Sequence, residues 1–152
     1  MKKRIKKDNR GYSEKQINEE FDRVIKNVEL FYVLMKDAKT TKNMRFMRAQ
    51  KELYISEKDF ERGKCTISSY RSFSISPQGV KHFRGNSKAY IWTIILEAPV
   101  GTNAVYIAPK AGREGPKNYI RQMETIVGPD TECDIICVDD EHHTAVLRAI
   151  IN

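Results

Sequence analysis

The chain has 152 residues, the length of one protein domain, which is enough to bury one sizeable hydrophobic core. It is 40% hydrophobic and 31% charged, and it has no apolar run of about 18 residues, which excludes a membrane-spanning helix. Residues 1–10 hold six Lys or Arg and one Asp, so +5 of the net charge of +7 lies there and the body is nearly balanced. We therefore expect no basic recognition face within the fold. Nucleic acid is not expected as a partner except through this basic segment, which is also the one part suited to contact an anionic membrane surface.

The first twelve residues are predicted to be a basic, disordered leader, and residues 13–152 a single domain. No apolar run follows the charged start, and a secretory signal needs one. We expect a cytoplasmic protein, or one that is delivered into a target cell without a classical signal peptide.

A long helix is expected first, from Ser13 to about Lys36. Ser13 and Gln16 fit a capping box, in which each side chain bonds to the backbone N–H of the other residue. Apolar residues then recur every three or four positions and predict one buried helix face, formed by Ile17, Phe21, Val24, Val28, Phe31 and Met35.

About seven strands are predicted after this helix, because β-branched and aromatic residues alternate with turns rich in Gly, Pro and Asp. Their ranges are 44–50, 64–74, 89–96, 104–107, 122–127, 132–138 and 144–151. Short helices are predicted at 56–60 and after Pro77, where Ser76 can act as the N-cap. One long helix followed by strands indicates an α+β domain.

The three cysteines, Cys65, Cys133 and Cys137, cannot all pair within one chain, and we expect reduced thiols. Cys133 and Cys137 lie four residues apart in a predicted strand, which separates them by roughly 13 Å at ~3.3 Å per residue. Two thiolates on one zinc must each lie about 2.3 Å from the metal, so no metal site is expected. Whether Cys65 is reactive stays open.

Two pairs of polar residues have the spacing that points both side chains to the same face of a strand. They are Ser74 with Ser76 and Gln122 with Glu124, and the second pair follows a predicted loop over residues 108–121. Loops this long inside a compact domain are often functional. Taken alone, each pair also fits the solvated face of an antiparallel sheet.

Four segments in order strengthen the functional interpretation: Phe46-Met-Arg48-Ala49, Tyr70-Arg-Ser-Phe73-Ser74-Ile-Ser76, Pro99-Val-Gly-Thr-Asn-Ala-Val-Tyr-Ile107 and Gln122-Met-Glu124. Their order and spacing resemble the mono-ADP-ribosyltransferase family of cholera-like toxins, clostridial exoenzymes and several phage enzymes. That family has an Arg on its first strand, aromatic-Ser-Thr-Ser on its second, and Glu-x-Glu or Gln-x-Glu late in the sheet. The resemblance covers roughly residues 14–138 and implies a mixed or antiparallel two-sheet core preceded by the helix.

The resemblance implies that the chain transfers ADP-ribose from NAD⁺ to a protein side chain and releases nicotinamide, without a metal. Glu124 would stabilise the oxocarbenium-like ribose, and Arg48 would bind the diphosphate. Ser74 would bind near the ribose and help to hold Glu124. The resemblance also assigns three further positions to the NAD⁺ site: Ser76, which supports its strand, Ala49 and Phe83.

The residue at position 122 indicates which kind of side chain accepts the ADP-ribose. In this family Glu at that place accompanies arginine as acceptor, so Gln122 implies a different acceptor, which its amide would hold by hydrogen bonds. Tyr119 is the candidate contact with the protein substrate, and it fits equally well as a residue that packs the loop on the sheet. The chain departs from the family pattern at Ala49, where Gly is common, and at Ile75, where Thr is common. Arg45 would replace Arg48 in the pattern if the register were wrong.

Two alternatives remain. One is a catalytically silent domain of the same fold, used for binding or as part of a virion. The other is a small basic RNA-binding domain, which would need aromatic and basic residues interleaved on a sheet face. The sequence offers such residues at Tyr70, Arg71, Phe73, Lys88, Tyr90 and Trp92. For the enzyme, we expect a host or target-cell protein as substrate, and we favour a phage protein or a bacterial effector over a toxin of a toxin–antitoxin pair.

Overall fold

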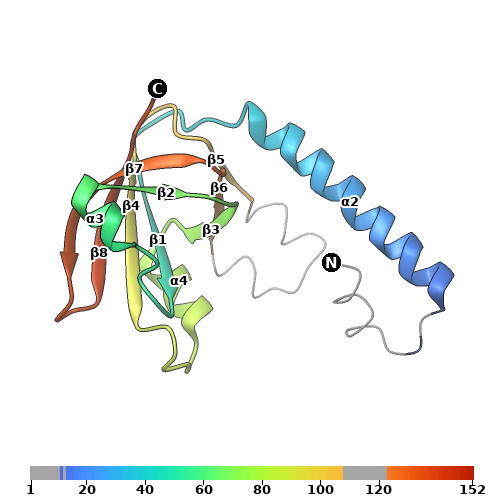
Figure 1. Cartoon of the computed structure of the whole chain (residues 1–152), viewed down its shortest axis with the longest axis horizontal. Helices are drawn as coiled ribbons and strands as arrows, with labels where there is room; N and C mark the ends of the chain where they lie inside the picture. The colour runs from blue at the N-terminus through green and yellow to red at the C-terminus, as the bar shows by residue number, and fades with distance from the viewer. Residues whose placement is uncertain (1–10, 12, 108–122) are drawn as a thin grey trace. The chain divides into compact units, whose positions relative to one another are not determined.

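The computed structural model describes residues 11, 13–107 and 123–152. It distinguishes two compact units, one that contains the N-terminal helix and one that runs from Ala38 to Asn152. Figure 1 shows the strands of the second unit gathered around a common interior. The division into a leader over residues 1–12 and one domain over residues 13–152 stays a prediction.

Helix α2 runs from Glu14 to Lys36, as the sequence predicts. Its capping box is present: the Gln16 backbone N donates to Ser13 Oγ at 3.3 Å, and the Ser13 N donates to Gln16 Oε1 at 2.9 Å. These bonds satisfy N–H groups that a helix start otherwise leaves unpaired. None of the helices that the structure describes is long and apolar enough to cross a membrane.

The second unit contains, within the described residues, eight strands and two short helices. In chain order they are β1 (Met44–Gln50), α3 (Glu57–Arg62), β2 (Lys64–Ile67), β3 (Arg71–Ser74), α4 (Pro77–Arg84), β4 (Trp92–Ala98), β5 (Ala104–Tyr106), β6 (Glu124–Val127), β7 (Thr131–Asp139) and β8 (Thr144–Ala149). One prediction was wrong: the segment 64–74 forms two strands instead of one. Its first half pairs with β7 and its second half with β6, so the chain changes neighbours between them.

The strands follow the order β2-β7-β8-β4-β1-β3-β6-β5, and only β4 and β8 are parallel among the described pairs. The α+β prediction with a mixed sheet after a long helix is therefore confirmed. The two expected sheets are joined into one order, but the junction is narrow, because β1 and β3 share the single register pair Met47 and Ser74. Few backbone hydrogen bonds therefore join one half of the sheet, β2-β7-β8-β4-β1, to the other half, β3-β6-β5.

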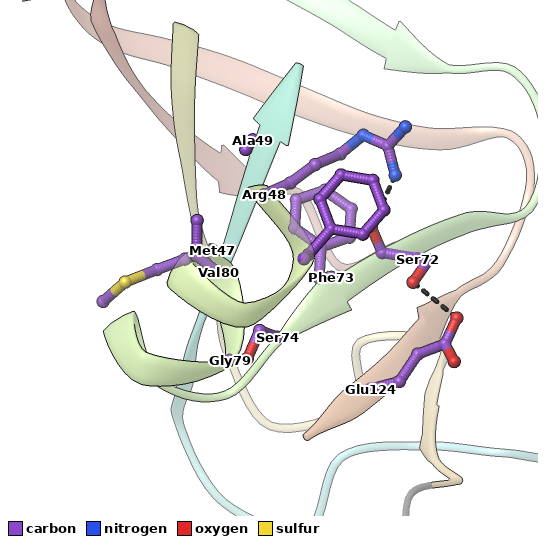
Figure 2. A pocket seen from close by; sticks show the side chains of 10 residues that line it. Met47, Arg48, Ala49, Ser72, Phe73, Ser74, Gly79, Val80 and Glu124 are labelled. Carbon is purple, nitrogen blue, oxygen red and sulfur yellow. Dashed lines mark hydrogen bonds between the residues drawn. The ribbon is translucent and has the colours of Figure 1, made fainter. Parts of the chain in front are cut away.

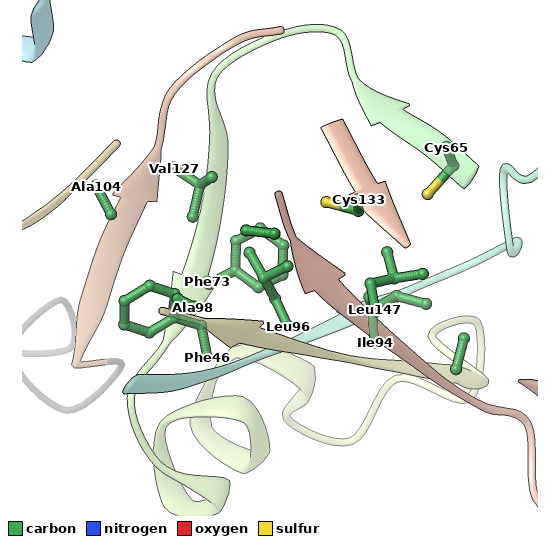
Figure 3. Packing of buried hydrophobic residues seen from close by; sticks show 12 residues of the cluster. Phe46, Cys65, Phe73, Ile94, Leu96, Ala98, Ala104, Val127, Cys133 and Leu147 are labelled. Atoms are coloured by element: carbon green, nitrogen blue, oxygen red, sulfur yellow. The ribbon is translucent and has the colours of Figure 1, made fainter. Parts of the chain in front are cut away.

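The core lies between the two halves of the sheet. Strand β4 alternates buried and half-buried residues, with Ile94 and Leu96 turned inward. Phe73 of β3 and Val127 of β6 belong to the same buried cluster, so strands on either side of the β1–β3 junction pack on one interior (Figure 3). Burial of this cluster holds the two halves of the sheet in a fixed relation.

Leu96 is fully buried in this cluster, so Leu96→Ala is expected to lower the free energy of unfolding by about 2–5 kcal/mol. The cause is lost apolar burial plus the cavity that remains. Urea denaturation measures the change. Val100→Ala is the control, because Val100 is 54% exposed and its truncation is expected to cost no more than about 0.5 kcal/mol. Similar losses in the two variants would contradict this assignment of the core.

Candidate active site

The β1–β3 junction and the neighbouring strand β6 bring three of the predicted site residues together. Arg48 lies on β1, Ser74 on β3, and Glu124 begins β6. The register places Ser74 opposite Met47 on one side and opposite Glu124 on the other. Residues far apart in the chain thus meet in one row across three strands.

These residues line one pocket, whose empty volume is about 300 Å³. Helix α4 packs against β1 and β3 and supplies part of the wall. The lining residues are Met47, Arg48, Ala49, Ser72, Phe73, Ser74, Gly79, Val80, Phe83 and Glu124. The pocket therefore brings together five of the predicted site residues: Arg48, Ala49, Ser74, Phe83 and Glu124.

A hydrogen-bonded chain crosses the pocket. Arg48 Nη1 donates to the backbone oxygen of Ser72 at 2.6 Å, and Ser72 Oγ donates to Glu124 Oε1 at 2.5 Å. Figure 2 shows Ser72 between the guanidinium and the carboxylate. Both bonds involve an ionised group, so they are stronger than bonds between neutral groups. Ser72 thereby fixes the position of both charged side chains.

The sequence interpretation assigned the contact with Glu124 to Ser74, and in the structure Ser72 makes it. The Ser74 hydroxyl is instead engaged locally: it donates to the Ser76 oxygen at 3.1 Å and accepts from the Ser76 N at 3.3 Å. Ser72 and Ser74 lie on the same strand face, and a long Glu side chain reaches the diagonal cross-strand neighbour as well as the direct one. The same spacing of two residues that singled out Ser74 and Ser76 would have found Ser72.

Ser76 caps α4. Its Oγ accepts from the Gly79 backbone N at 3.2 Å, and Pro77 occupies the first turn, which confirms the predicted N-cap. Ser76 Oγ also contacts Met123 Sδ at 3.1 Å, which ties the cap to the residue before β6. Ser76 thus orients the helix that carries Phe83. The Phe83 ring is 43% exposed and meets the Tyr90 ring edge-on at 5.3 Å.

The Arg48 guanidinium is desolvated and incompletely paired. Burial, and next the positive charge of Arg71, lower the pKa of Arg48, but an Arg stays protonated at any physiological pH. Its Nε is buried and has no hydrogen-bond partner among the described residues. A buried cation with an unused N–H favours an anionic group beside it.

Arg45, the alternative to Arg48 in the sequence pattern, lies outside this pocket. Its Nη2 is 3.4 Å from Glu97 Oε1, and Arg148 Nη2 is 2.8 Å from Glu97 Oε2. Hydrogen bonding to Arg148, and then to Arg45, lowers the pKa of the Glu97 carboxyl. Arg45 therefore pairs with Glu97 outside the pocket, and Arg48 is the cation among the described residues that line it.

Gln122 and Tyr119 lie outside the described residues, as does the predicted loop over residues 108–121. Met123, the first residue described after it, has a φ of 49°, which is uncommon for a residue with a side chain. Across residues 11, 13–107 and 123–152, no group of three His, Cys, Asp or Glu side chains is arranged to hold a metal ion.

Comparison with known proteins gives the fold. No family model and no curated protein sequence matches the chain. Among solved structures, Plx2a, an ADP-ribosyltransferase toxin from Paenibacillus larvae, is similar over 83% of this chain and 70% of its own, with a TM-score of 0.57 and 16% identity. The fold is that of the ADP-ribosyltransferase toxins.

Two further proteins of this fold agree. An ADP-ribosyltransferase from Clostridium botulinum matches over 86% of this chain and 70% of its own, with a TM-score of 0.56 and 14% identity. The Clostridium limosum C3 exoenzyme matches over 82% and 67%, with a TM-score of 0.51 and 17% identity. At such identities the likeness concerns the backbone, and the chemistry must be argued from the side chains of the pocket.

Ser72→Ala removes the donor to Glu124 and is expected to lower the free energy of unfolding by about 1 kcal/mol, at the low end for a bond to a charged group because water can reach this carboxylate. Chemical denaturation measures it. Ser69→Ala, at an exposed serine between β2 and β3, is the matched control and is expected to change stability by less than about 0.5 kcal/mol. An unchanged midpoint in the Ser72 variant would argue against the bond.

Proposed function

We propose that this chain is an NAD⁺-dependent mono-ADP-ribosyltransferase, a glycosyltransferase that moves ADP-ribose from NAD⁺ to a protein side chain and releases nicotinamide. The observation that carries the proposal is the bonded chain from Arg48 through Ser72 to Glu124, in a pocket of a chain with the ADP-ribosyltransferase fold. The Arg48 cation and the Glu124 carboxylate are both hydrogen-bonded to one serine. This arrangement suits a substrate that carries a diphosphate next to a reactive ribose. One structure of this fold, of a protein from S. aureus, was solved with NAD.

Glu124 is the proposed catalytic carboxylate. Cleavage of the bond between nicotinamide and ribose develops positive charge on the sugar, as in glycoside hydrolysis, and a fixed negative charge nearby lowers the barrier. The bond from Ser72 uses Oε1, and in the described part of the chain Oε2 makes no hydrogen bond. Oε2 is therefore available to a ribose hydroxyl while the carboxylate keeps its orientation.

Arg48 is the proposed diphosphate ligand. Its guanidinium remains charged, is partly desolvated and belongs to a side chain that lines the pocket, so it would attract an anionic oxygen there. The bond from Nη1 to the Ser72 oxygen holds the planar group in one orientation before the ligand arrives. Such preorganisation reduces the conformational entropy lost on binding.

Phe83 and Ala49 are proposed as apolar walls for the nicotinamide end of the substrate, with Ser74 and Ser76 as its polar support. Phe83 is partly exposed in the lining of the pocket, so its ring can contact a planar group. Ala49 is buried on β1 beside Arg48, where a small side chain leaves room for the ligand. Nicotinamide and the adjacent ribose would thereby lie near Glu124.

The acceptor is proposed to be a side chain other than arginine, on a host or target-cell protein. The Gln122-x-Glu124 pattern supports this, because an amide orients an acceptor by hydrogen bonds but cannot neutralise a guanidinium as a second carboxylate does. Tyr119 is proposed to contact the protein substrate. A phage protein or bacterial effector that acts in the cytoplasm, or is delivered into a target cell, fits this role.

A catalytically silent domain is expected to have lost the charged residues of the pocket. Arg48 and Glu124 are both present, and each is hydrogen-bonded to Ser72. The RNA-binding alternative requires aromatic rings that are free to stack on bases. Phe73 and Trp92, two of its candidates, are buried. These observations favour the transferase.

The direct test is NAD⁺ consumption by the purified chain, with labelled NAD⁺ and a cell lysate as the source of acceptor. Glu124→Ala is expected to lower nicotinamide release and lysate labelling by about 100-fold or more, because it removes the charge that faces the developing cation. Arg48→Ala is expected to raise KM for NAD⁺. Its matched control, Arg45→Ala, is expected to retain activity because Arg45 lies outside the pocket.

If the wild type neither binds nor consumes NAD⁺, the silent-domain alternative replaces the transferase. If Glu124→Ala stays active while circular dichroism shows it folded, another residue carries the chemistry.

Gln122→Ala separates the two reactions of such an enzyme. Transfer to protein is expected to fall at least about tenfold while nicotinamide release by water continues, because the amide would orient the acceptor and not the ribose. Scintillation counting of labelled protein and chromatography of free nicotinamide measure the two activities in one sample. Equal loss of both would remove Gln122 from the acceptor site.

A further inference from the structure

Two buried cysteines face each other on neighbouring strands, and neither lines the pocket of the candidate active site. Cys65 of β2 and Cys133 of β7 are direct partners in the antiparallel register. Both are free thiols, Cys65 at 7% and Cys133 at 0% exposure. Figure 3 shows the two residues at the edge of the buried cluster, each with its sulfur inside the fold.

Their backbone separation suits a covalent bond. The Ile135 N donates to the Gly63 oxygen at 2.8 Å, which marks Gly63 and Ile135 as a hydrogen-bonded pair of the ladder. Such pairs alternate along antiparallel strands, so Cys65 and Cys133, two positions on, are also a hydrogen-bonded pair. The Cα atoms of such pairs lie about 5.5 Å apart, within the range of about 4.4–6.8 Å found for disulfides.

The Cβ atoms of the two cysteines are less favourably placed for a disulfide than their Cα atoms, so a disulfide between them would be strained. Facing Cβ atoms lie about 4.5–5.5 Å apart, at the wider end in hydrogen-bonded pairs, whereas a disulfide needs about 3.5–4.5 Å. Strand β2 must therefore move inward. It can, because it has four residues and ends the strand order. A bond formed this way is strained and is reduced more easily than an unstrained one.

One of the two cysteines lines a pocket. Cys65 lines a second pocket, of about 740 Å³ empty volume, together with Arg48, Gln50, Thr66 and Arg71. Cys133 does not line it. A small oxidant that enters the second pocket therefore meets Cys65 first.

We propose that Cys65 and Cys133 form a reversible thiol-oxidation site, at which a small hydroperoxide closes a disulfide between β2 and β7. Cys65 lines the second pocket and Cys133 does not, and the Cys133 Sγ donates to the Thr131 oxygen at 3.7 Å. The peroxide therefore reacts with the Cys65 thiolate, and Cys133 resolves the product.

The reaction balances with hydrogen peroxide as the oxidant. The Cys65 thiolate attacks one peroxide oxygen, the O–O bond breaks, and the hydroxide that leaves takes a proton to become water. Cys133 then attacks the Cys65 sulfenic acid, loses its proton and releases a second water as the S–S bond forms. Two thiols are thus oxidised by two electrons, and one peroxide is reduced to two waters.

Closure would fix one wall of the second pocket, because β2 supplies Cys65, Thr66 and Ile67 to it. This pocket shares Arg48 with the candidate active site. Cys137 is not part of the site: it is exposed, and in the register it faces Val146 of β8.

The experiment uses the full chain with Cys137→Ser, which removes the exposed thiol and leaves two of the three cysteines. The folded protein is treated with hydrogen peroxide and then denatured, and its free thiols are titrated. The count is expected to fall from two to zero, and peptide mapping is expected to find Cys65 joined to Cys133 within one chain. Reduced glutathione is expected to restore both thiols.

Two matched variants test the order of events. Cys133→Ser is expected to stop at a sulfenic acid on Cys65, detectable by dimedone labelling, whereas Cys65→Ser is expected to leave Cys133 unlabelled. Unchanged thiols in the folded Cys137→Ser chain, or bonds only between chains, would overturn the proposal. A disulfide that resists glutathione would overturn its reversibility. None of these measurements depends on NAD⁺ chemistry.

Discussion

The narrow junction between β1 and β3 is the constraint on which the rest of this molecule depends. A sheet joined through the one pair Met47 and Ser74 has few backbone bonds at that point, so side-chain burial must hold its halves together. The shared core of Phe73, Ile94 and Leu96 does so. Met47 and Ser74 both line the pocket, so the charged residues of the candidate site lie beside this junction.

The cost of burying the Arg48 guanidinium near this junction is partly offset by a hydrogen bond to the backbone. Desolvation opposes a charged guanidinium, and the Ser72 carbonyl offsets part of that cost through its bond with Arg48. The offset is incomplete, since Nε stays unpaired within the described residues. Incomplete satisfaction of a buried cation lowers stability and raises affinity for an anion, a compromise that binding sites often make. The proposed diphosphate ligand would find this cation already in place, at some cost to the stability of the folded chain.

The long helix, the cap at Ser76 and most of the strands could be predicted because they depend on local rules: periodicity, capping and β-propensity. The strand break between Ile67 and Arg71 could not, because the β2 segment pairs with β7 and the β3 segment pairs with β6, and both partners lie far away in the chain. The same limit explains Ser72. Its hydroxyl was visible in the sequence, but the register pairs Glu124 with Ser74, and only the side-chain conformations in the folded chain bring the carboxylate to Ser72.

Sequence information alone was enough for the α+β class, for the helix Glu14–Lys36, and for the presence of Arg48, Ser74 and Glu124 in an order that resembles one family. Three-dimensional packing settled which arginine faces the pocket, which serine holds the carboxylate, and that Cys65 meets Cys133. Side-chain identity and local periodicity can be read from the sequence, and they determine where helices and strands form. Contacts between strands depend on register and twist, which arise only when distant segments pack on a common core.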